Sequence, residues 1–334
     1  MSGPLQAVTR CDGFLCCVGC MSLVPGLVKR VVNQVAFFPP KPPGYHVTEE
    51  KQVFLVEGDY GLTPLPDLTA EGIAVDTVRM LTAKGSVIMG FHFRRARSSR
   101  TLLFSHGNST DIGIMFHHLR DLCYRLQVDV FAYEYSGYGE SSGVPSEDNL
   151  YSDIDAAYQY LTIDRGVPGD QVVCYGQSVG SVPSIDLASR CHVGGLILHS
   201  ALKSGLGVIH DVQANYWFDV FQNVAKMGRV QAPVFVIHGT HDAEVPFEHG
   251  LALYEACPPE LAFDPWWVKE AGHNDIETNN RGLYFKNLDR FLSALDKADS
   301  HLGRRSDSEL EVSSSPRSWQ PLMSSKGGLY EPVR

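Results

Sequence analysis

Short runs of apolar residues recur through the middle of the chain at the length of β-strands. Several runs are apolar throughout, which is typical of strands covered on both faces. We expect strands at residues 53–56, 87–93, 101–105, 128–133, 171–175, 195–199 and 234–238. Between them, apolar positions recur every three or four residues over 112–126 and 154–161, as in amphipathic helices. Strands that alternate with helices predict an α/β fold with a mainly parallel, doubly wound sheet and helices on both faces.

The two ends of the chain differ in composition from this central part. Residues 1–38 are apolar and cysteine-rich, and Pro39–Pro43 should form a stiff, extended connector. From about Asp296 onward Ser, Arg and Asp predominate, with too few apolar residues to pack. We therefore divide the chain into an N-terminal appendage with its connector at 1–43, a folded domain at 44–296 and a disordered Ser-rich tail at 297–334.

Charge and cysteine usage argue against nucleic-acid binding and against a disulfide-bonded fold. The net charge of −10 is spread without a basic stripe, so we expect no nucleic-acid partner. Four of the eight cysteines crowd near the N-terminus and four are scattered, which is not a disulfide framework. The scattered ones are Cys123, Cys174, Cys191 and Cys257. We interpret them as small buried hydrophobic residues of a reduced, intracellular protein. We expect neither a metal nor a cofactor.

No apolar stretch predicts a membrane-spanning helix. Such a helix needs about 20 apolar residues, and the longest candidate, Gly13–Val28, contains Pro25. A secretory signal would need a basic start, an apolar core and a cleavage site of small residues. Only Arg10 and a short core at Phe14–Val18 are present, so we expect no secretory signal.

One motif carries the strongest chemical signal. The segment Gly176-Gln177-Ser178-Val179-Gly180 matches G-x-S-x-G and follows a predicted strand directly, and residues 182–190 can continue as a helix. A strand, a sharp turn and a helix form the nucleophile elbow of serine hydrolases. The two glycines are required because side chains there would collide with neighbouring backbone. This context predicts Ser178 as a nucleophile.

A serine hydroxyl needs a base that takes its proton and a carboxylate that orients that base, in the chain order Ser, Asp, His. Asp242 follows the predicted strand 234–238, and His273 follows the strand-like segment Trp266–Val268. Both therefore lie at strand ends, where open α/β sheets bind their ligands. We predict Asp242 as the orienting carboxylate and His273 as the general base of a catalytic domain at 44–296.

Each of these residues also has a structural interpretation. Asp242 could cap a turn or a helix, and His273 could be an ordinary polar histidine. Asp275 could be a further partner of His273 or simply solvated. The order and context of Ser178, Asp242 and His273 together favour catalysis, because three independent accidents are less probable than one. Three other histidines are assigned structural roles: His238, His241 and His249.

Hydrolysis also requires N–H donors for the oxyanion of the tetrahedral intermediate. One donor should be the backbone N–H of Val179, and the second that of Asn108, in the segment His106-Gly107-Asn108 after the predicted strand 101–105. We assign His106 the structural role of holding that loop. The glycine-rich segment Tyr135–Ser141 lacks the spacing of a dinucleotide-binding loop, so we expect it to shape the rim of the active site.

The chain resembles the α/β-hydrolase domain-containing protein 17 family of palmitoyl-protein thioesterases over about residues 10–296. The resemblance rests on the N-terminal cysteines followed by Ala36–Pro40, and on Ser105–Asn108, Tyr135–Ser141, Gly176–Gly180, His249–Glu255 and Ala271–Glu277. It implies an α/β-hydrolase fold and thioester hydrolysis on S-acylated proteins at membranes, with Ser178, Asp242 and His273 at matching positions. The chain departs from the family pattern at Val179 and at Ala201, and neither is a position of the triad.

Fold and triad do not fix the substrate. The same arrangement supports a carboxylesterase, a monoacylglycerol lipase or a serine aminopeptidase. The segment between Ser200 and Val234 is too short for a large cap, and a minimal cap suits an acyl chain presented on a protein surface. A membrane-docked pseudo-hydrolase scaffold is the alternative that is not an enzyme, but such proteins typically lose a triad residue.

The N-terminal cysteines predict lipidation. They lie beside apolar residues, and no histidine precedes His46 to complete a zinc site, so we expect S-acylation at Cys11, Cys16, Cys17 and Cys20. Two or more acyl chains anchor a protein stably, aided here by Lys29 and Arg30 near anionic lipid. Residues 1–43 would then target the protein to the cytosolic face of plasma and endosomal membranes, with Pro39–Pro43 as a spacer. The oligomeric state stays open.

Overall fold

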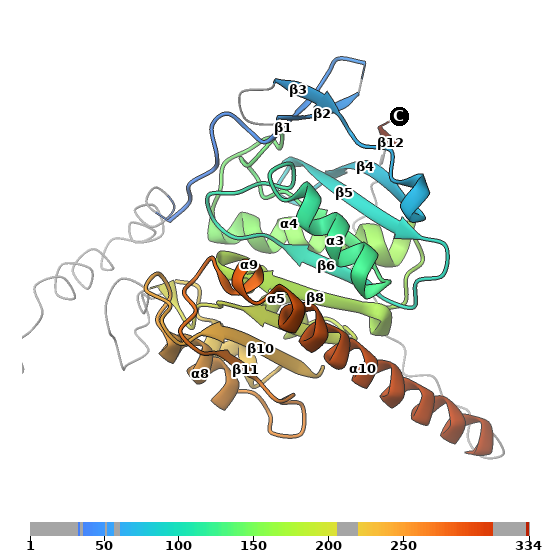
Figure 1. Ribbon diagram of the computed structural model, residues 1–334, viewed down its shortest axis with the longest axis vertical. Coiled ribbons are helices and arrows are strands. Elements are labelled where there is room, and N and C mark those ends of the chain that lie inside the picture. Colours follow the sequence, from blue (N-terminus) through green and yellow to red (C-terminus); the bar gives the residue numbers. More distant parts are fainter. Residues whose placement is uncertain are drawn as a thin grey trace, which may run out of the picture.

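The computed structural model describes residues 36–50, 52–56, 61–205 and 220–309, together with Asn33 and the strand Pro332–Val333. A nine-stranded sheet of order β11-β10-β9-β8-β6-β7-β5-β4-β12 forms its centre (Figure 1). The strands are β4 (Ile73–Leu81), β5 (Val87–Arg95), β6 (Thr101–Ser105), β7 (Asp129–Tyr133), β8 (Val172–Gln177), β9 (Gly195–His199), β10 (Val234–Gly239), β11 (Trp266–Val268) and β12 (Pro332–Val333).

The sheet is parallel from β7 to β11, while β5, β4 and β12 add to it in antiparallel fashion. The predicted α/β class and parallel sheet are therefore confirmed. A second, antiparallel sheet of β1 (Tyr45–Val47), β2 (Val53–Val56) and β3 (Leu62–Pro64) lies beside the first. The sequence did not predict β4, because polar residues interrupt its apolar pattern; one of them, Asp76, pairs with Arg94 of β5 at 2.7 Å.

Side chains alternate along each strand into two separate cores, one on each face of the sheet. In β6, for example, Leu103 enters one core, and Leu102 and Phe104 enter the other. The helices α4 (Glu147–Gln159), α5 (Ser181–Ala188), α7 (Asn223–Met227) and α8 (Phe247–Glu255) cover the first face. The helices α3 (Phe116–Leu126), α9 (Ile276–Asn279) and α10 (Arg281–Glu309) cover the second. Each fully buried Leu or Phe contributes about 2–3 kcal/mol relative to an exposed one, so the two cores hold the sheet rigid.

The helices follow from local sequence. In α3, Leu119, Leu122 and Leu126 are buried at helical spacing, and the helix ends where Gln127 adopts a left-handed φ of 57°. The Ser146 hydroxyl caps α4 by accepting a hydrogen bond from the N–H of Asn149 at 3.1 Å. A π-helical turn, η3 (Tyr160–Asp164), extends α4. The helices predicted at 112–126 and 154–161 thus exist, with shifted starts.

The last helix continues beyond the boundary that composition indicated at residue 296. Arg100 is 3% exposed, and its guanidinium donates to Asp296 at 2.6 Å and to Asp299 at 2.5 Å. Charge pairs rather than apolar packing therefore hold this part of α10. Further along, the pair Pro332–Val333 joins the sheet beside Val78 and Thr77.

Three predictions fall on residues outside the described ranges. These are the S-acylated cysteines between residues 11 and 20, most of the disordered tail, and the minimal cap, which involves residues 206–219. In the part of the chain that the structure describes, no helix has both the length and the hydropathy of a membrane span.

Candidate active site

Ser178 occupies a sharp turn between β8 and α5. Its φ is 52°, a left-handed conformation that costs a non-glycine residue about 1–3 kcal/mol. The flanking glycines make the turn possible, because a Cβ on Gly176 would lie 2.6 Å from the carbonyl oxygen of Gly180, and one on Gly180 would lie 2.1 Å from that of Ser105. The strained turn lifts the Ser178 side chain out of the sheet edge and into a pocket.

The structure brings together the three residues predicted as a triad. The Nε2 atom of His273 lies 3.0 Å from the Ser178 hydroxyl oxygen, and Nδ1 lies 2.8 Å from Oδ2 of Asp242. Asp242 follows β10 and His273 follows β11, so both project from the carboxyl edge of the parallel sheet. This geometry allows His273 to accept the serine proton at Nε2 while Nδ1–H donates to the carboxylate.

Asp242 is held as an ionised acceptor. Its Oδ1 accepts hydrogen bonds from the N–H groups of Glu244 at 3.0 Å and Val245 at 2.8 Å, and its Oδ2 lies 3.4 Å from Nε2 of His238. Burial raises the pKa of Asp242, but the bonds with His238, His273 and Val245 outweigh it and hold the pKa well below its usual range. A permanently charged carboxylate at this position fixes the orientation of His273.

The other polar residues weighed from the sequence lie in different places. His238 is fully buried and contacts Asp242, so it belongs to the site, which the sequence interpretation missed. His249 is buried and accepts a hydrogen bond from the Lys203 N–H at 3.1 Å, as a structural histidine does. His241 is exposed. Asp275 accepts from the N–H of Gly272 at 2.7 Å and thereby braces the turn that carries His273.

A pocket of about 600 Å³ opens over Ser178 and His273. Its wall has apolar parts from Phe38, Met115 and Ile276 and polar parts from His199, Glu244 and Glu277. Burial lowers the pKa of His199 to about 4, so this side chain is neutral at physiological pH. The one signal that could have found His199 is its position at the end of β9, on the same sheet edge as the triad.

The segment between β6 and α3, residues 106–115, forms the wall next to the serine; we call it the β6–α3 loop. Asn108 lines the pocket together with Ser178, and a Cβ on Gly107 would lie 3.8 Å from that of Ser178. Val179 follows the serine directly in the turn. Asn108 and Val179 thus border the serine, Asn108 from the pocket wall and Val179 from the same turn.

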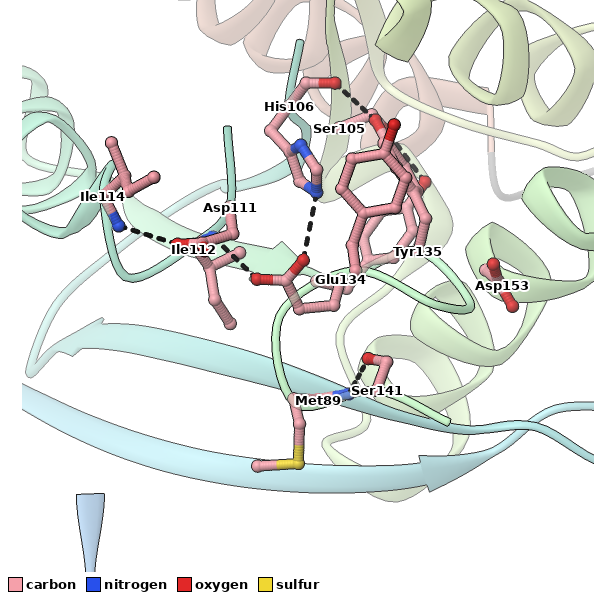
Figure 2. Close-up of polar contacts among 12 residues, drawn as sticks. Met89, Ser105, His106, Asp111, Ile112, Ile114, Glu134, Tyr135, Ser141 and Asp153 are labelled. Carbon is pink, nitrogen blue, oxygen red and sulfur yellow. Dashed lines mark hydrogen bonds and ion pairs between the residues drawn. The ribbon is translucent and has the colours of Figure 1, made fainter. Parts of the chain in front are cut away.

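Buried polar contacts support the β6–α3 loop from behind (Figure 2). His106 Nδ1 lies 2.8 Å from the Gly107 carbonyl oxygen. Its Nε2 lies 3.3 Å from Oε2 of Glu134. Glu134 Oε1 accepts from the Ile112 N–H at 2.7 Å, and the Tyr135 hydroxyl donates to the His106 carbonyl. Burial raises the pKa of Glu134, partly offset by its bond with His106. These contacts agree with the structural role expected of His106.

The segment Tyr135–Ser141 lies behind the β6–α3 loop rather than at the rim of the pocket. Tyr135 and Tyr138 are buried and contact His106 and Asn108 respectively, and neither lines the pocket. The Ser141 hydroxyl accepts a hydrogen bond from the Met89 N–H, which fixes the far end of the segment to β5. The prediction of a rim loop is therefore wrong, since aromatic side chains turn the segment inward.

Within the described ranges, no cluster of three His, Cys, Asp or Glu side chains is arranged to hold a metal.

The mainly parallel sheet, the serine turn between β8 and α5 and the Ser178–His273–Asp242 array define an α/β hydrolase. Residues 96–215 match a family described as serine aminopeptidase, S33. Among solved structures, the chain is similar to the Pyrococcus furiosus esterase Pf2001, with a TM-score of 0.58 and 17% identity over 69% of this chain and 95% of that one. At this identity the likeness shows the fold.

More similar relatives place the chain within one family. It is 40% identical to α/β-hydrolase domain-containing protein 17B of Homo sapiens over 286 residues, 84% of this chain and 95% of that protein. It is 48% identical to protein 17C of Homo sapiens over 222 residues, 66% of each chain. It is 40% identical to α/β-hydrolase domain-containing protein aho-3 of Caenorhabditis elegans, over 83% of this chain and 81% of that protein. The chain belongs to the α/β-hydrolase domain-containing protein 17 family, and the predicted family is confirmed.

Proposed function

We propose that the protein is a serine hydrolase that removes palmitoyl groups from S-acylated cysteines of membrane-associated proteins. The observation that carries this proposal is the hydrogen-bonded array of Ser178, His273 and Asp242 at the base of an open pocket. Family membership supports the thioester as the bond that is broken, and the apolar part of the pocket wall suits an acyl chain.

The reaction divides into two steps. The Ser178 oxygen forms a bond to the thioester carbonyl carbon while His273 Nε2 takes the hydroxyl proton, and the oxyanion accepts hydrogen bonds from the N–H groups of Asn108 and Val179. The carbon–sulfur bond then breaks, and the cysteine sulfur takes the proton from His273. Water attacks the acyl-enzyme in the same manner, giving the fatty acid and free Ser178. Asp242 stabilises the protonated histidine in both steps.

Attachment to a membrane completes the proposal. Acyl chains on Cys11, Cys16, Cys17 and Cys20 would hold the protein on the cytosolic face of plasma and endosomal membranes, near S-acylated protein substrates. Replacing all four cysteines by serine should release the protein to the cytosol and leave hydrolysis of a soluble thioester intact. A quadruple variant that stays on membranes after a carbonate and salt wash would contradict acylation as the anchor.

A second candidate is hydrolysis of a different acyl bond. The match to the serine aminopeptidase family and the fold of an esterase support a carboxylesterase, a monoacylglycerol lipase or an aminopeptidase. These activities would use the same triad with a different leaving group.

One experiment decides between these substrates. The purified full-length protein is given, in detergent micelles, an S-palmitoyl peptide, the O-palmitoylserine analogue of that peptide, a monoacylglycerol and an aminopeptidase substrate, each at several concentrations. We expect the highest kcat/KM on the thioester, a loss of at least about a thousandfold in Ser178→Ala, and labelling of the wild type alone by a fluorophosphonate. A higher kcat/KM on any other substrate would replace the proposed one, and absence of fluorophosphonate labelling would reject a serine hydrolase.

A further inference from the structure

The chain just before the domain packs directly against the β6–α3 loop. We call residues 36–45 the N-terminal arm. Sequence composition predicts this stretch as a spacer between membrane and domain, whereas the structure fixes it to the wall of the pocket at two points. The boundary predicted at residue 43 therefore falls inside a segment that is hydrogen-bonded to the pocket wall.

The first point of attachment is the side-chain amide of Asn108. Its Nδ2 donates to the Ala36 carbonyl at 2.7 Å, and its Oδ1 accepts from the Phe38 N–H at 2.9 Å. The Tyr138 hydroxyl also donates to Oδ1, at 2.6 Å. The amide thus pairs with a carbonyl and an N–H two residues apart, as a neighbouring strand would. This arrangement restrains the residue whose own N–H is proposed to hold the oxyanion.

The second point of attachment is Asp111, three residues further along the same loop. Its Oδ2 accepts from the Gly44 N–H at 2.6 Å, and its Oδ1 accepts from the Ile114 N–H at 2.8 Å. The backbones are in direct contact here, because a Cβ on Gly44 would lie 2.6 Å from the Ile114 nitrogen. Four prolines lie between the two points and restrict the backbone, so fixing both ends fixes the whole arm.

Two phenylalanines of the arm have opposite environments. Phe37 is 6% exposed and packs edge-on against Phe221, with ring centroids 6.0 Å apart. Phe38 is 56% exposed and lines the pocket. An apolar ring of this exposure on a pocket wall loses contact with water when an acyl chain lies against it, which favours binding of longer chains.

We propose that the N-terminal arm is a functional part of the active site, in which it positions the Asn108 N–H through the Asn108 side chain and supplies Phe38 as a contact for the acyl chain. The inference rests on the proposed function, since it uses Asn108 as an oxyanion donor. Asn108 is then a positioning residue through its side chain, and Phe38 determines acyl-chain specificity.

Full-length variants test the proposal, with kcat and KM measured on acetyl and palmitoyl thioesters of one soluble peptide. Asn108→Ala keeps the backbone N–H but loses both bonds to the arm, so kcat should fall about 10- to 100-fold on both substrates with little change in KM. Phe38→Ala should raise KM for the palmitoyl substrate several-fold and change KM for the acetyl substrate much less. Phe38→Pro also removes the backbone N–H that donates a hydrogen bond to Oδ1 of Asn108. It should therefore lower kcat on both substrates relative to Phe38→Ala.

Asn149→Ala is the matched control, because the Asn149 amide also donates to a backbone carbonyl, that of Val144 at 2.8 Å, but lies outside the pocket. It should leave kcat within about twofold of the wild type. Thermal unfolding identifies any variant that fails to fold. In that case Tyr138→Phe replaces Asn108→Ala, because it removes one bond to Asn108 and the weaker bond from the Phe38 N–H at 3.2 Å, and a smaller loss of kcat is expected.

The rate of fluorophosphonate labelling at Ser178 gives a readout that does not depend on the substrate. It should fall in Asn108→Ala and stay constant in Asn149→Ala. A folded Asn108→Ala variant with unchanged kcat and labelling rate would overturn the arm proposal, even if the wild type hydrolyses the thioester. A wild type that is labelled but does not hydrolyse the thioester would reject the substrate instead, and the labelling rates would still test the arm.

Discussion

Two carboxylate–histidine pairs lie at the carboxyl edge of the same sheet, and their surroundings give them different properties. Asp242 with His273 follows β10 and β11, and Glu134 with His106 follows β7 and β6. In the first pair the free ring nitrogen of the histidine faces the Ser178 hydroxyl. In the second pair the other ring nitrogen is bonded to the Gly107 carbonyl, within the loop itself.

The carboxylates differ in the number of donors that reach them. Asp242 receives two backbone N–H groups and lies close to two histidines, which lower its pKa despite burial. Glu134 receives one backbone N–H and one histidine contact, so burial predominates and raises its pKa. The groups around a carboxylate–histidine pair, rather than the pair itself, therefore determine whether the pair can transfer protons or holds a loop.

The largest expected effect comes from removing the charge of the first pair. Asp242→Asn should lower kcat by about four orders of magnitude, because an amide stabilises the wrong tautomer of His273. Steady-state kinetics with thermal unfolding as the control measures this. If the variant keeps a tenth of the wild-type rate, another carboxylate orients the histidine, and Asp275 would be the first to test.

Removing the charge of the second pair should have a smaller effect on rate. Glu134→Gln keeps an oxygen for the Ile112 N–H but changes the contact with His106, so we expect kcat to fall about tenfold through a shift of the β6–α3 loop. The same kinetic assay measures the change, together with fluorophosphonate labelling. A loss as large as that of Asp242→Asn would show that the two pairs do not differ in function.

Among the described residues, the buried carboxylate of Asp153 has no histidine partner, and it should make stability depend on pH. Asp153 accepts hydrogen bonds from the N–H and hydroxyl of Ser136, and burial raises its pKa to about 7. Because the folded state then binds a proton more tightly than the unfolded state, this group makes the protein less stable as pH rises from about 4 to about 7. Asp153→Asn should remove this contribution, which changes the free energy of unfolding by on the order of 2–4 kcal/mol over that pH range.

Urea titrations of both proteins at pH 5 and pH 8 measure the difference. The variant should gain stability relative to the wild type at both pH values, with a clearly larger gain at pH 8 than at pH 5. Equal pH slopes for the two proteins would contradict a raised pKa at Asp153.

The sequence predicted those parts of the fold and site that depend on local pattern. The strands buried on both faces, the serine turn with Gly176 and Gly180, and the strand ends before Asp242 and His273 all have local signals. The outer strand β4 was missed because its polar residues hide the period of two.

Contacts between distant segments have no such signal. The pairing of Asn108 with Ala36 joins residues 72 positions apart, and His238 reaches Asp242 only because of the turn after β10. The proline-rich stretch was interpreted as a spacer because proline composition describes stiffness but not where a stiff segment packs. Its attachment to Asp111 depends on the close approach of Gly44 to the β6–α3 loop, which only the folded chain shows.

The fixed start of the N-terminal arm also limits how far the enzyme can reach. Sixteen residues lead from Cys20 to Ala36, and Ala36 is bonded to a residue of the pocket wall. A fully extended chain of that length spans at most about 55 Å. If Cys20 carried an acyl chain, this length would limit the distance between the pocket and the bilayer surface, and the protein would reach only substrate bonds close to the lipid.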